Sequence, residues 1–510
     1  MESYVAGADA DAFAAARNTF NCLIGQLTDP QTLSVSHDRL EDLLVEQGRE
    51  LQRLLLQAHL DLRAERERRA AERLRGAGAG IVGADGRMRR RLEAGHHRLL
   101  AMVFGTVTVT RCAWRAAGTG YLHPADAALS LPAGRHSHGL ARLAAVEAVR
   151  GSFDNALEAI GARCGNVVGK RQLLELVRRA AVDIDTFNAS VMPMPRTADE
   201  VLIVSCDQKG IVMRPEALRP ATAKAAARAR RTFRTRLAAG EKPARKRMAT
   251  LAAVYDAVPA PRRPHDVIAV PGGRHGTRRP RPGPHAERKW LGGSVIAEPD
   301  EVIAQAFDHA ESRDPTHART WVVLIDGAQH QLDLIRAEAA RRRAPIHIVI
   351  DFVHVIEKLW AGAWDLHRPG DPAAENWVAT HALALLAGHT DQVIAALHAQ
   401  AAALGEHRRG EINACIRYLT NHAAFLRYDQ ALGAGWPIAT GVIEGAVRHI
   451  VADRLDIGGA RWGLEGAEAV LKLRTVVANG HFLAYWRHHL AQEHHRVHHT
   501  RRQDEYDLTA

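Results

Sequence analysis

WVVLIDGAQH, residues 321–330, runs through five apolar residues before it reaches Asp326. An unpaired carboxylate is costly to bury, so a buried strand that ends on one calls for an explanation. Two other stretches repeat the pattern: VLIVSCDQKG (201–210) leads to Asp207, and IHIVIDFVHV (346–355) leads to Asp351. We therefore predict three neighbouring strands of one sheet whose ends gather carboxylates at one edge, as a site for divalent cations requires.

The order of the predicted elements indicates the fold class. Three strands come first, and helices then alternate with strands, which is typical of an α/β ribonuclease-H-like sheet. The expected strands are 201–206, 248–257, about 290–297, 321–325 and 346–350, and the expected helices are 300–312, 331–343 and 352–365.

The chain is too long for one hydrophobic core, so several units are expected. We predict a ribonuclease-H-like catalytic domain with a helical insertion, preceded by a mainly helical N-terminal DNA-binding region. The expected boundaries are 1–100 for a helical region, 101–195 for a strand pair with a helix-turn-helix-like part, 196–371 for the catalytic core with basic insertions, 372–432 for the helical insertion, and 433–510 for the completion of the core and a C-terminal helix.

The stretch SFDNALEAIGARCGNVVGKRQLLELVRRAA (152–181) has the pattern of a helix, a glycine-containing turn and a second, basic helix. Such a helix-turn-helix could place Lys170 and Arg171 against DNA. Helical hairpins of this kind are also common without DNA binding, and the residues alone leave both interpretations open.

Charge is unevenly distributed. Lys and Arg number 68 against 57 Asp and Glu, yet residues 209–289 hold 21 basic and 5 acidic residues, which leaves the remainder slightly acidic. A basic segment in such a chain points to a polyanion, most often nucleic acid, or else to a solvated insertion. The run Arg245, Lys246 and Arg247 is the candidate for phosphate contacts. The N-terminus lacks a signal-peptide pattern and no apolar run is long enough to span a membrane, so we expect a soluble intracellular protein.

A third acidic ligand is expected on a helix late in the chain. In PIATGVIEGAVRHIVADRL (437–455), apolar spacing marks a buried face and leaves Glu444 near the helix start. A metal-ligand role competes with an ordinary ion pair between Glu444 and Arg448 four residues later. Arg448, Arg454, Arg461 and Trp462 follow closely, where phosphate contacts and base stacking would be useful. A buried structural role for Trp462 fits the sequence equally well.

Several long stretches resemble bacterial insertion-sequence transposases of the DDE type, in the ISKra group related to Mutator-like elements. The resemblance covers roughly residues 100–500 and is carried by VLIVSCDQKGIVMRPEALRPAT, KRMATLAAVYDAVPAPR, WVVLIDGAQHQLDLIR, IHIVIDFVHVIEKLW, PIATGVIEGAVRHIVADRLDIGGARWGLEGAEAVLKLR and NGHFLAYWRHHL. It implies a catalytic, metal-binding triad of Asp207, Asp326 and Glu444, with an Asp-x-x-His motif at Asp351 and His354. The chain reads DQKG where the family pattern has DGKG, and DIGGARW where the pattern has Thr in place of the first Gly.

From the residues alone, Asp351 rivals Asp326 for the second catalytic position. Gly327 lets the chain turn away sharply after Asp326, whereas Phe352 and Val353 enclose Asp351. We therefore expect Asp326 to bind metal, with Asp351 and His354 behind it as hydrogen-bonding supports. For His354, the role of a satisfied core histidine stays open.

The resemblance implies a transposase that uses two Mg²⁺ ions, with Mn²⁺ as a possible substitute, to cut DNA at the ends of its element and join the 3′ ends to target DNA. It also implies work in the bacterial cytoplasm, at the nucleoid, as at least a dimer. Two alternatives are a ribonuclease-H-like DNA nuclease, such as a junction resolvase, and a non-catalytic DNA-binding protein derived from a transposase.

Overall fold

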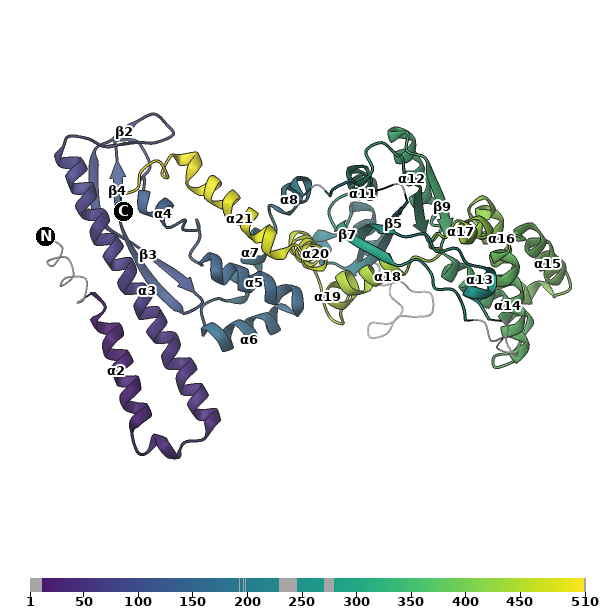
Figure 1. Ribbon diagram of the computed structural model, residues 1–510, viewed down its shortest axis with the longest axis horizontal. Helices are drawn as coiled ribbons and strands as arrows, with labels where there is room; N and C mark the ends of the chain where they lie inside the picture. Colours follow the sequence, from purple (N-terminus) through teal and green to yellow (C-terminus); the bar gives the residue numbers. More distant parts are fainter. Residues whose placement is uncertain are drawn as a thin grey trace. The chain divides into compact units, whose positions relative to one another are not determined.

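The computed structural model describes residues 12–191, 193–195, 197, 199–228, 245–269 and 279–508. The chain forms two compact units (Figure 1). Unit 1 comprises Met1–Phe187 and Phe482–Ala510, and unit 2 comprises Asn188–His481. Much of the two basic insertions, 229–244 and 270–278, lies outside the described residues. No helix within the described ranges is long and apolar enough to cross a bilayer.

A long helix packed on a β-hairpin forms the base of unit 1. The hairpin pairs β3 (Arg91–Met102) with β4 (Gly105–Arg115), and α3 (His37–Gly76) lies against it. Gln57 of α3 exchanges two hydrogen bonds with the backbone of Thr108, at 2.8 and 2.9 Å. These bonds hold the helix to β4, and the apolar core lies beside them at Leu60, Leu100, Val107, Val109 and Leu131.

The remaining elements of unit 1 are short or helical. They are α2 (Ala14–Thr28), β1 (Ile81–Val82), β2 (Met88–Arg89), α4 (Pro124–Ala128), α5 (His138–Arg150), α6 (Phe153–Cys164), α7 (Lys170–Arg179), α8 (Ile184–Ser190), which reaches across the boundary of the units, α21 (Phe482–Val497) and the 3₁₀ turns η1 (Thr32–Ser34) and η6 (His499–Arg501).

The C-terminal helix belongs to unit 1. The Tyr485 hydroxyl of α21 donates to the Ala180 carbonyl at 2.6 Å, and Arg496 makes a two-pronged ion pair with Asp183 at 2.6 and 2.9 Å. Asp183 also accepts a 2.7 Å hydrogen bond from His489. The chain therefore enters unit 2 within α8 and returns to unit 1 for its last helix.

Unit 2 is built on a five-stranded mixed sheet. The strands are β5 (Val201–Val212), β6 (Lys246–Ala257), β7 (Ala286–Ser294), β8 (Trp321–Ile325) and β9 (Ile346–Ile350), in the spatial order β7-β6-β5-β8-β9. The strands β5, β8 and β9 are mutually parallel, while β6 runs antiparallel to both of its neighbours. The mixed α/β class is therefore confirmed, and the three strands that lead to Asp207, Asp326 and Asp351 are neighbours, as predicted.

Helices cover the sheet because its central strands are apolar on both faces. Every residue of β8 is buried, as are the first six of β5. Beside the sheet lie α11 (Pro299–Arg313), α12 (Gln329–Arg342), α13 (Phe352–Leu366), α18 (Gly441–Ala446), the π-helical turn η5 (Val447–Ala452), α19 (Asp453–Leu455) and α20 (Leu464–Ala478).

The chain between the last strand and the Glu444 helix is helical, and it lies at the right of Figure 1. It contains α14 (Pro372–Leu386), α15 (Thr390–Ala402), α16 (Gly410–His422), α17 (Tyr428–Gly433) and two 3₁₀ turns, η3 (Glu406–Arg408) and η4 (Ala423–Phe425). Unit 2 also contains η2 (Pro215–Ala217), α9 (Pro220–Arg228) and α10 (Pro264–Val267). The insertion is attached to α13, on which α14 and α16 both pack.

The prediction that a strand ends just before Asp207 is wrong. β5 continues to Val212, and Asp207 pairs with Leu251 of β6 inside the antiparallel ladder. Only the parallel ladder with β8 stops early, at Ser205 and Leu324. Gln208 therefore occupies a strand position, opposite Thr250 of β6. Asp207 is half-buried.

Candidate metal centre

Strand register places three aspartates at one level of the sheet. Ser205 pairs with Leu324, and Ile325 pairs with Ile350. Counting on from these pairs, Asp207, Asp326 and Asp351 stand beside one another just beyond the ends of the two parallel ladders. The carboxyl ends of parallel strands are where open α/β sheets bind their ligands. The three strands that lead to these aspartates therefore lie side by side in the sheet.

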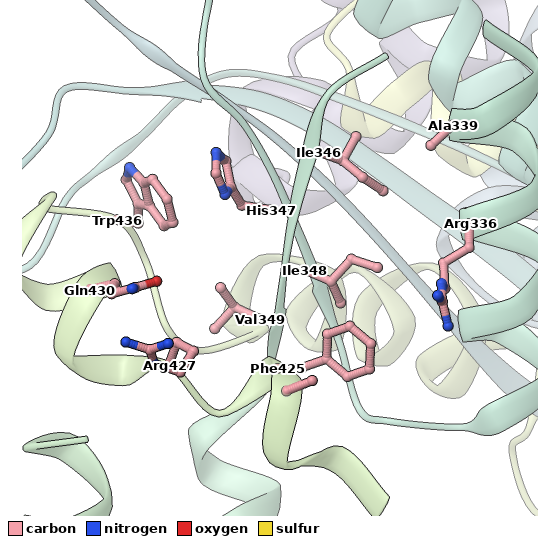
Figure 2. Close-up of a pocket in the computed structure, with 11 residues that line it drawn as sticks. Arg336, Ala339, Ile346, His347, Ile348, Val349, Phe425, Arg427, Gln430 and Trp436 are labelled. Atoms are coloured by element: carbon pink, nitrogen blue, oxygen red, sulfur yellow. The ribbon is translucent and has the colours of Figure 1, made fainter. Parts of the chain in front are cut away.

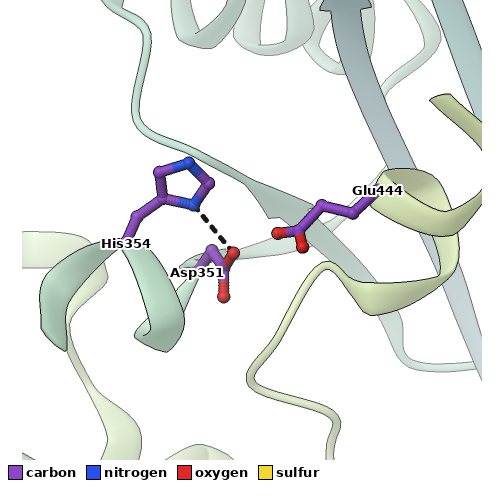
Figure 3. A group of neighbouring side chains, drawn as sticks. All are labelled: Asp351, His354 and Glu444. Carbon is purple, nitrogen blue, oxygen red and sulfur yellow. Dashed lines mark hydrogen bonds and ion pairs between the residues drawn. The ribbon is translucent and has the colours of Figure 1, made fainter. Parts of the chain in front are cut away.

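Glu444 lies in α18 (Gly441–Ala446), which follows the helical insertion in the sequence. Among the described residues, one group has the composition and spacing to hold a metal ion: Asp351, His354 and Glu444 each offer a ligand atom, and these atoms lie within 4.8 Å of one another (Figure 3). Glu444 lies in the first turn of α18, directly before the π-helical turn η5. Such π-helical segments are frequent at functional sites.

Asp351 is saturated with hydrogen bonds. Its side chain is fully buried, and Oδ1 accepts from the Val353 backbone N–H at 2.9 Å, which caps α13. Its Oδ2 accepts from the Thr440 hydroxyl at 2.6 Å and from Nδ1 of His354 at 2.9 Å. Burial raises the pKa of Asp351, but these hydrogen bonds outweigh it and hold the pKa below its ordinary value. Asp351 thus supports both His354 and Thr440 through hydrogen bonds, and it belongs to the group of described residues that could hold a metal ion.

His354 carries the matching positive charge. The hydrogen bond to Asp351 raises the pKa of His354 to about 9; burial opposes this shift, and the negative charges of Asp351, Glu357 and Asp326 add to it. The hydrogen bond to Asp351 therefore favours the protonated imidazole, in which both ring nitrogens are donors, whereas the neutral imidazole would offer one ring nitrogen to a metal.

Thr440 connects the two acidic partners. Its hydroxyl lies 2.6 Å from Oδ2 of Asp351 and 2.6 Å from Oε1 of Glu444. Because a hydroxyl has only one proton, it donates to one of these two oxygens at a time. The hydrogen bond from Thr440 lowers the pKa of Glu444, but burial and the nearby Asp351 outweigh it, so the pKa is raised. The alternative interpretation of Glu444 does not hold: no ion pair joins it to Arg448 in the part of the chain described.

Asp207 shares the electrostatic field of this group. Burial raises its pKa, the backbone hydrogen bond from Gln208 opposes the shift, and the negative charges of Asp326 and Glu444 raise the pKa further. The charges of Asp326 and Glu444 therefore both act on Asp207. Among the described residues, however, the group whose ligand atoms lie close enough together to hold a metal ion is Asp351, His354 and Glu444, and it includes neither Asp207 nor Asp326. Carboxylate oxygens are the ligands that Mg²⁺ prefers.

The insertion braces the backbone at Asp326. Gly327 has φ +90°, the left-handed geometry that favours glycine, so the predicted sharp turn is present. From α16, the Tyr418 hydroxyl donates to the carbonyl of Asp326 at 2.8 Å, and Nε2 of His422 lies 2.8 Å from the carbonyl of Gly327. Asp326 itself accepts only from the Ala328 N–H among the described groups, which leaves its second oxygen available.

Sequence reasoning missed Tyr418, His422 and Thr440. The first two lie four residues apart in α16, which places them on one face of the helix. This spacing is the only feature of the sequence that links Tyr418 and His422, and it is common in helices that carry no functional site.

The predicted DNA-binding residues differ in exposure. Arg171, Arg448 and Arg461 are exposed, while Lys170 is paired with Asp154 at 2.6 Å. The prediction is wrong for Arg454 and Trp462, which are 3% and 6% exposed. The Arg454 guanidinium lies 4.8 Å over the Trp462 ring, and the Trp462 backbone bonds to β5 through Val212. Both residues therefore pack the core, as the alternative for Trp462 anticipated.

The three residues of the basic run at the start of β6 also differ in their contacts. Arg247 donates to the carbonyls of Val295 and Ile296, and Lys246 is paired with Asp456 at 3.3 Å. Arg245 is half-buried, without an acidic partner among the described residues.

A separate pocket of about 400 Å³ lies beside the edge strand β9 (Figure 2). Arg336, Phe425 and Arg427 line it, and His347 packs against Trp436 with ring centroids 4.6 Å apart. No acidic side chain is among the residues that line this pocket, so it does not offer the ligands of a magnesium site.

Comparison with known proteins adds no identity. No family model matches the chain, and no curated protein is similar to it.

Proposed function

We propose that this protein is a DDE transposase of an insertion sequence, with a ribonuclease-H-like catalytic domain in unit 2. Numbered along the chain, the sheet has the strand order 3-2-1-4-5 with the second strand antiparallel. That order supports the ribonuclease-H-like assignment, and it places the first and fourth strands side by side. The catalytic carboxylates of the proposal, Asp207 and Asp326, follow the ladder that joins these two strands.

One observation carries the proposal: Asp207, Asp326 and Asp351 follow the two parallel ladders of the sheet, and Glu444 lies beside Asp351 and His354, with their ligand atoms within 4.8 Å of one another. Acidic groups gathered at one edge of a sheet can form a binding site for cations. We assign Asp207, Asp326 and Glu444 to two Mg²⁺ ions, for which Mn²⁺ can substitute. When bound there, the ions would activate a water or a 3′-hydroxyl and stabilise the leaving oxygen of a phosphodiester.

The remaining residues position and balance the site. Asp351 orients His354, which offers its second N–H and its positive charge to the phosphate being attacked. Thr440 fixes the direction of Glu444, while Tyr418 and His422 fix the turn that presents Asp326. In this scheme the protein forms no covalent intermediate. It holds the strands and the attacking oxygen in line, which is the main requirement of phosphoryl transfer.

The substrates of the proposal are the two ends of the element and a target DNA. Holding both ends at once calls for at least a dimer. The setting is the bacterial cytoplasm, at the nucleoid. The exposed cations Arg171, Arg448 and Arg461 are candidates for phosphate contacts.

The direct test is DNA cutting by the full chain. The inverted repeats that flank the gene, placed on a labelled duplex, should be cut at their ends when Mg²⁺ is present and remain intact when it is chelated. Cutting that persists in chelator would refute the metal assignment. Specific binding of the repeats without any cutting would favour the non-catalytic DNA-binding alternative.

Salt dependence tests the basic run of β6. Replacing both Arg245 and Lys246 with Ala should weaken binding and reduce the slope of log K against log[salt] by up to about 2, because each lost phosphate contact releases about 0.9 counterions fewer. Fluorescence anisotropy at several salt concentrations measures this slope.

Arg247→Ala is the matched control for the run. Since its guanidinium is bound to the Val295 and Ile296 carbonyls, the substitution should affect stability more than the salt slope. An unchanged slope in the double variant would show that the run does not contact DNA.

A further inference from the structure

Unit 1 contains a cavity rich in arginine that none of the assigned roles uses. Its volume is about 650 Å³. We call it the arginine pocket, and its side chains include Arg98, Arg111, Tyr121, Arg135, Arg496 and Arg501. They come from β3, β4, two loops, α21 and η6, so elements from both ends of unit 1's sequence converge on one hollow.

The positive charge of the arginine pocket is only partly balanced. Asp126 is the single acidic side chain in its lining; Nε of Arg111 lies 2.9 Å from Asp126 Oδ1, and Nη1 of Arg98 lies 3.7 Å from Oδ2. Arg496 is neutralised by its ion pair with Asp183. Arg135 and Arg501 are exposed and have no acidic partner among the described residues. The pocket therefore has an excess of cations.

Two further observations agree with that excess. Nη1 of Arg111 is buried and has no hydrogen-bond partner within the described part of the chain. A buried donor without a partner is costly unless a ligand or water supplies an acceptor. His123, which also lines the pocket, has its pKa lowered to about 3 by burial and then by the charges of Arg111, His96, Arg98 and Arg501.

An aromatic surface lies beside the cations. Tyr121 is 40% exposed, and its ring packs edge-on against His96 with centroids 5.0 Å apart. The Arg115 guanidinium lies 5.6 Å from the centre of the same ring. An exposed, braced aromatic ring next to guanidinium groups is the usual arrangement for stacking a nucleobase whose phosphate is held nearby.

We propose that the arginine pocket binds one unpaired nucleotide of a DNA strand, with its phosphate held by Arg111, Arg135 and Arg501. The base stacks on Tyr121. The cavity volume lies in the range of small-ligand sites and suits one nucleotide rather than a double helix, whose major groove alone is about 12 Å wide. A free nucleotide has the same chemistry. The choice of DNA as the source of the nucleotide rests on the proposed function.

The test compares a blunt duplex with the same duplex carrying a four-nucleotide single-stranded overhang. Binding to the full chain is followed by fluorescence anisotropy in chelator, so that no strand is cut. The overhang should tighten binding by about tenfold, since stacking of one base contributes about 1–3 kcal/mol. Nucleoside monophosphate, added as a competitor at millimolar concentration, should reduce this preference without displacing the blunt duplex.

Variants locate the effect in the pocket. The double variant Arg135→Ala, Arg501→Ala should lose the preference for the overhang, whereas Arg90→Ala, Arg142→Ala, which removes two exposed arginines of unit 1 outside the pocket, should retain it. Tyr121→Ala should lose most of the preference and Tyr121→Phe should keep it, because phenylalanine retains the stacking surface.

Three results would overturn the inference. The first is equal binding of the blunt and overhanging duplexes by the parent protein. The second is an equal preference in the pocket and control double variants. The third is tight binding of the free nucleotide, sensitive to the pocket variants, without any preference for the overhang, which would assign the pocket to a small molecule. Each can occur while the repeats are still cut in Mg²⁺, so failure of this inference is distinguishable from failure of the proposed function.

Discussion

Asp326→Asn and Glu444→Gln should each abolish strand cutting and leave DNA binding within about twofold of the parent value. Both substitutions keep the shape of the side chain and remove one negative charge from the proposed metal ligands. Losing a ligand removes several kcal/mol of transition-state stabilisation, so the cutting rate should fall by about 10³-fold or more. Single-turnover cutting and anisotropy, measured on the same duplex, separate the two effects.

Two companion variants make this result interpretable. Asp333→Asn alters an exposed carboxylate of α12 seven residues beyond Asp326 and should cut normally. Asp351→Asn should reduce cutting by about 10–100-fold, the usual effect of disturbing a group that orients a site, since asparagine still caps α13 but no longer holds His354 protonated. Full activity in Asp326→Asn combined with none in Asp351→Asn would assign Asp351 to the metal and Asp326 to a supporting role.

Asp256→Asn should cost unit 2 about 3–5 kcal/mol of unfolding free energy. Asp256 is 1% exposed and accepts from Arg313 at 2.8 Å, from Arg319 at 2.7 Å and from Arg288 at 3.0 Å. Arg313 and Arg319 are each 3% exposed, so removing the carboxylate charge takes from two buried guanidinium groups their nearest acidic partner, while Arg319 keeps Glu200, 3.9 Å away. Urea unfolding, monitored by limited proteolysis of unit 2, measures the loss of unfolding free energy.

The control for this variant is Asp308→Asn on α11. Asp308 also pairs with an arginine, Arg342, at 2.7 Å, but its side chain is 69% exposed, so the cost should be about 0–1 kcal/mol. Burial raises the pKa of Asp256, and its arginines outweigh burial and lower it. Its contribution to stability is therefore present above the unfolded pKa of about 3.9 and is lost as the pH falls through the lower folded value. Equal losses in the two variants would contradict this account.

The sequence predicted the central strands well because their signal is local. β8 is a run of five buried apolar residues, and β9 is apolar except for the exposed His347, with Val349 and Ile350 buried. Each strand is followed by an aspartate that a strand interior would not tolerate unpaired. Their adjacency followed from the order of strands and helices. The glycine after Asp326 also predicted an open turn, and the φ of Gly327 agrees.

Features that depend on distant partners were not predictable. β3 escaped detection because a bulge between Glu93 and His96, with Gly95 at φ +76°, breaks the alternation of its side chains. β5 appeared to stop at Asp207 because its polar continuation, Gln208 to Gly210, is half-buried against β6 alone.

The residues that support the candidate site were not predictable for the same reason. Thr440, Tyr418 and His422 act through contacts with residues up to 95 positions away, and nothing in their local sequence marks them. Burial of Arg454 and Trp462 likewise arises from the path of the chain beside β5 rather than from their own segment.

The central claim is that metal binds to Asp207, Asp326 and Glu444, with Asp351 and His354 as supports. Crystals of the full chain soaked in Mn²⁺ would locate the ions directly by anomalous scattering. We predict peaks coordinated by oxygens of Asp207, Asp326 and Glu444, with His354 still bonded to Asp351. A peak coordinated by Asp351 and a nitrogen of His354, and none at Asp207 and Asp326, would contradict the account.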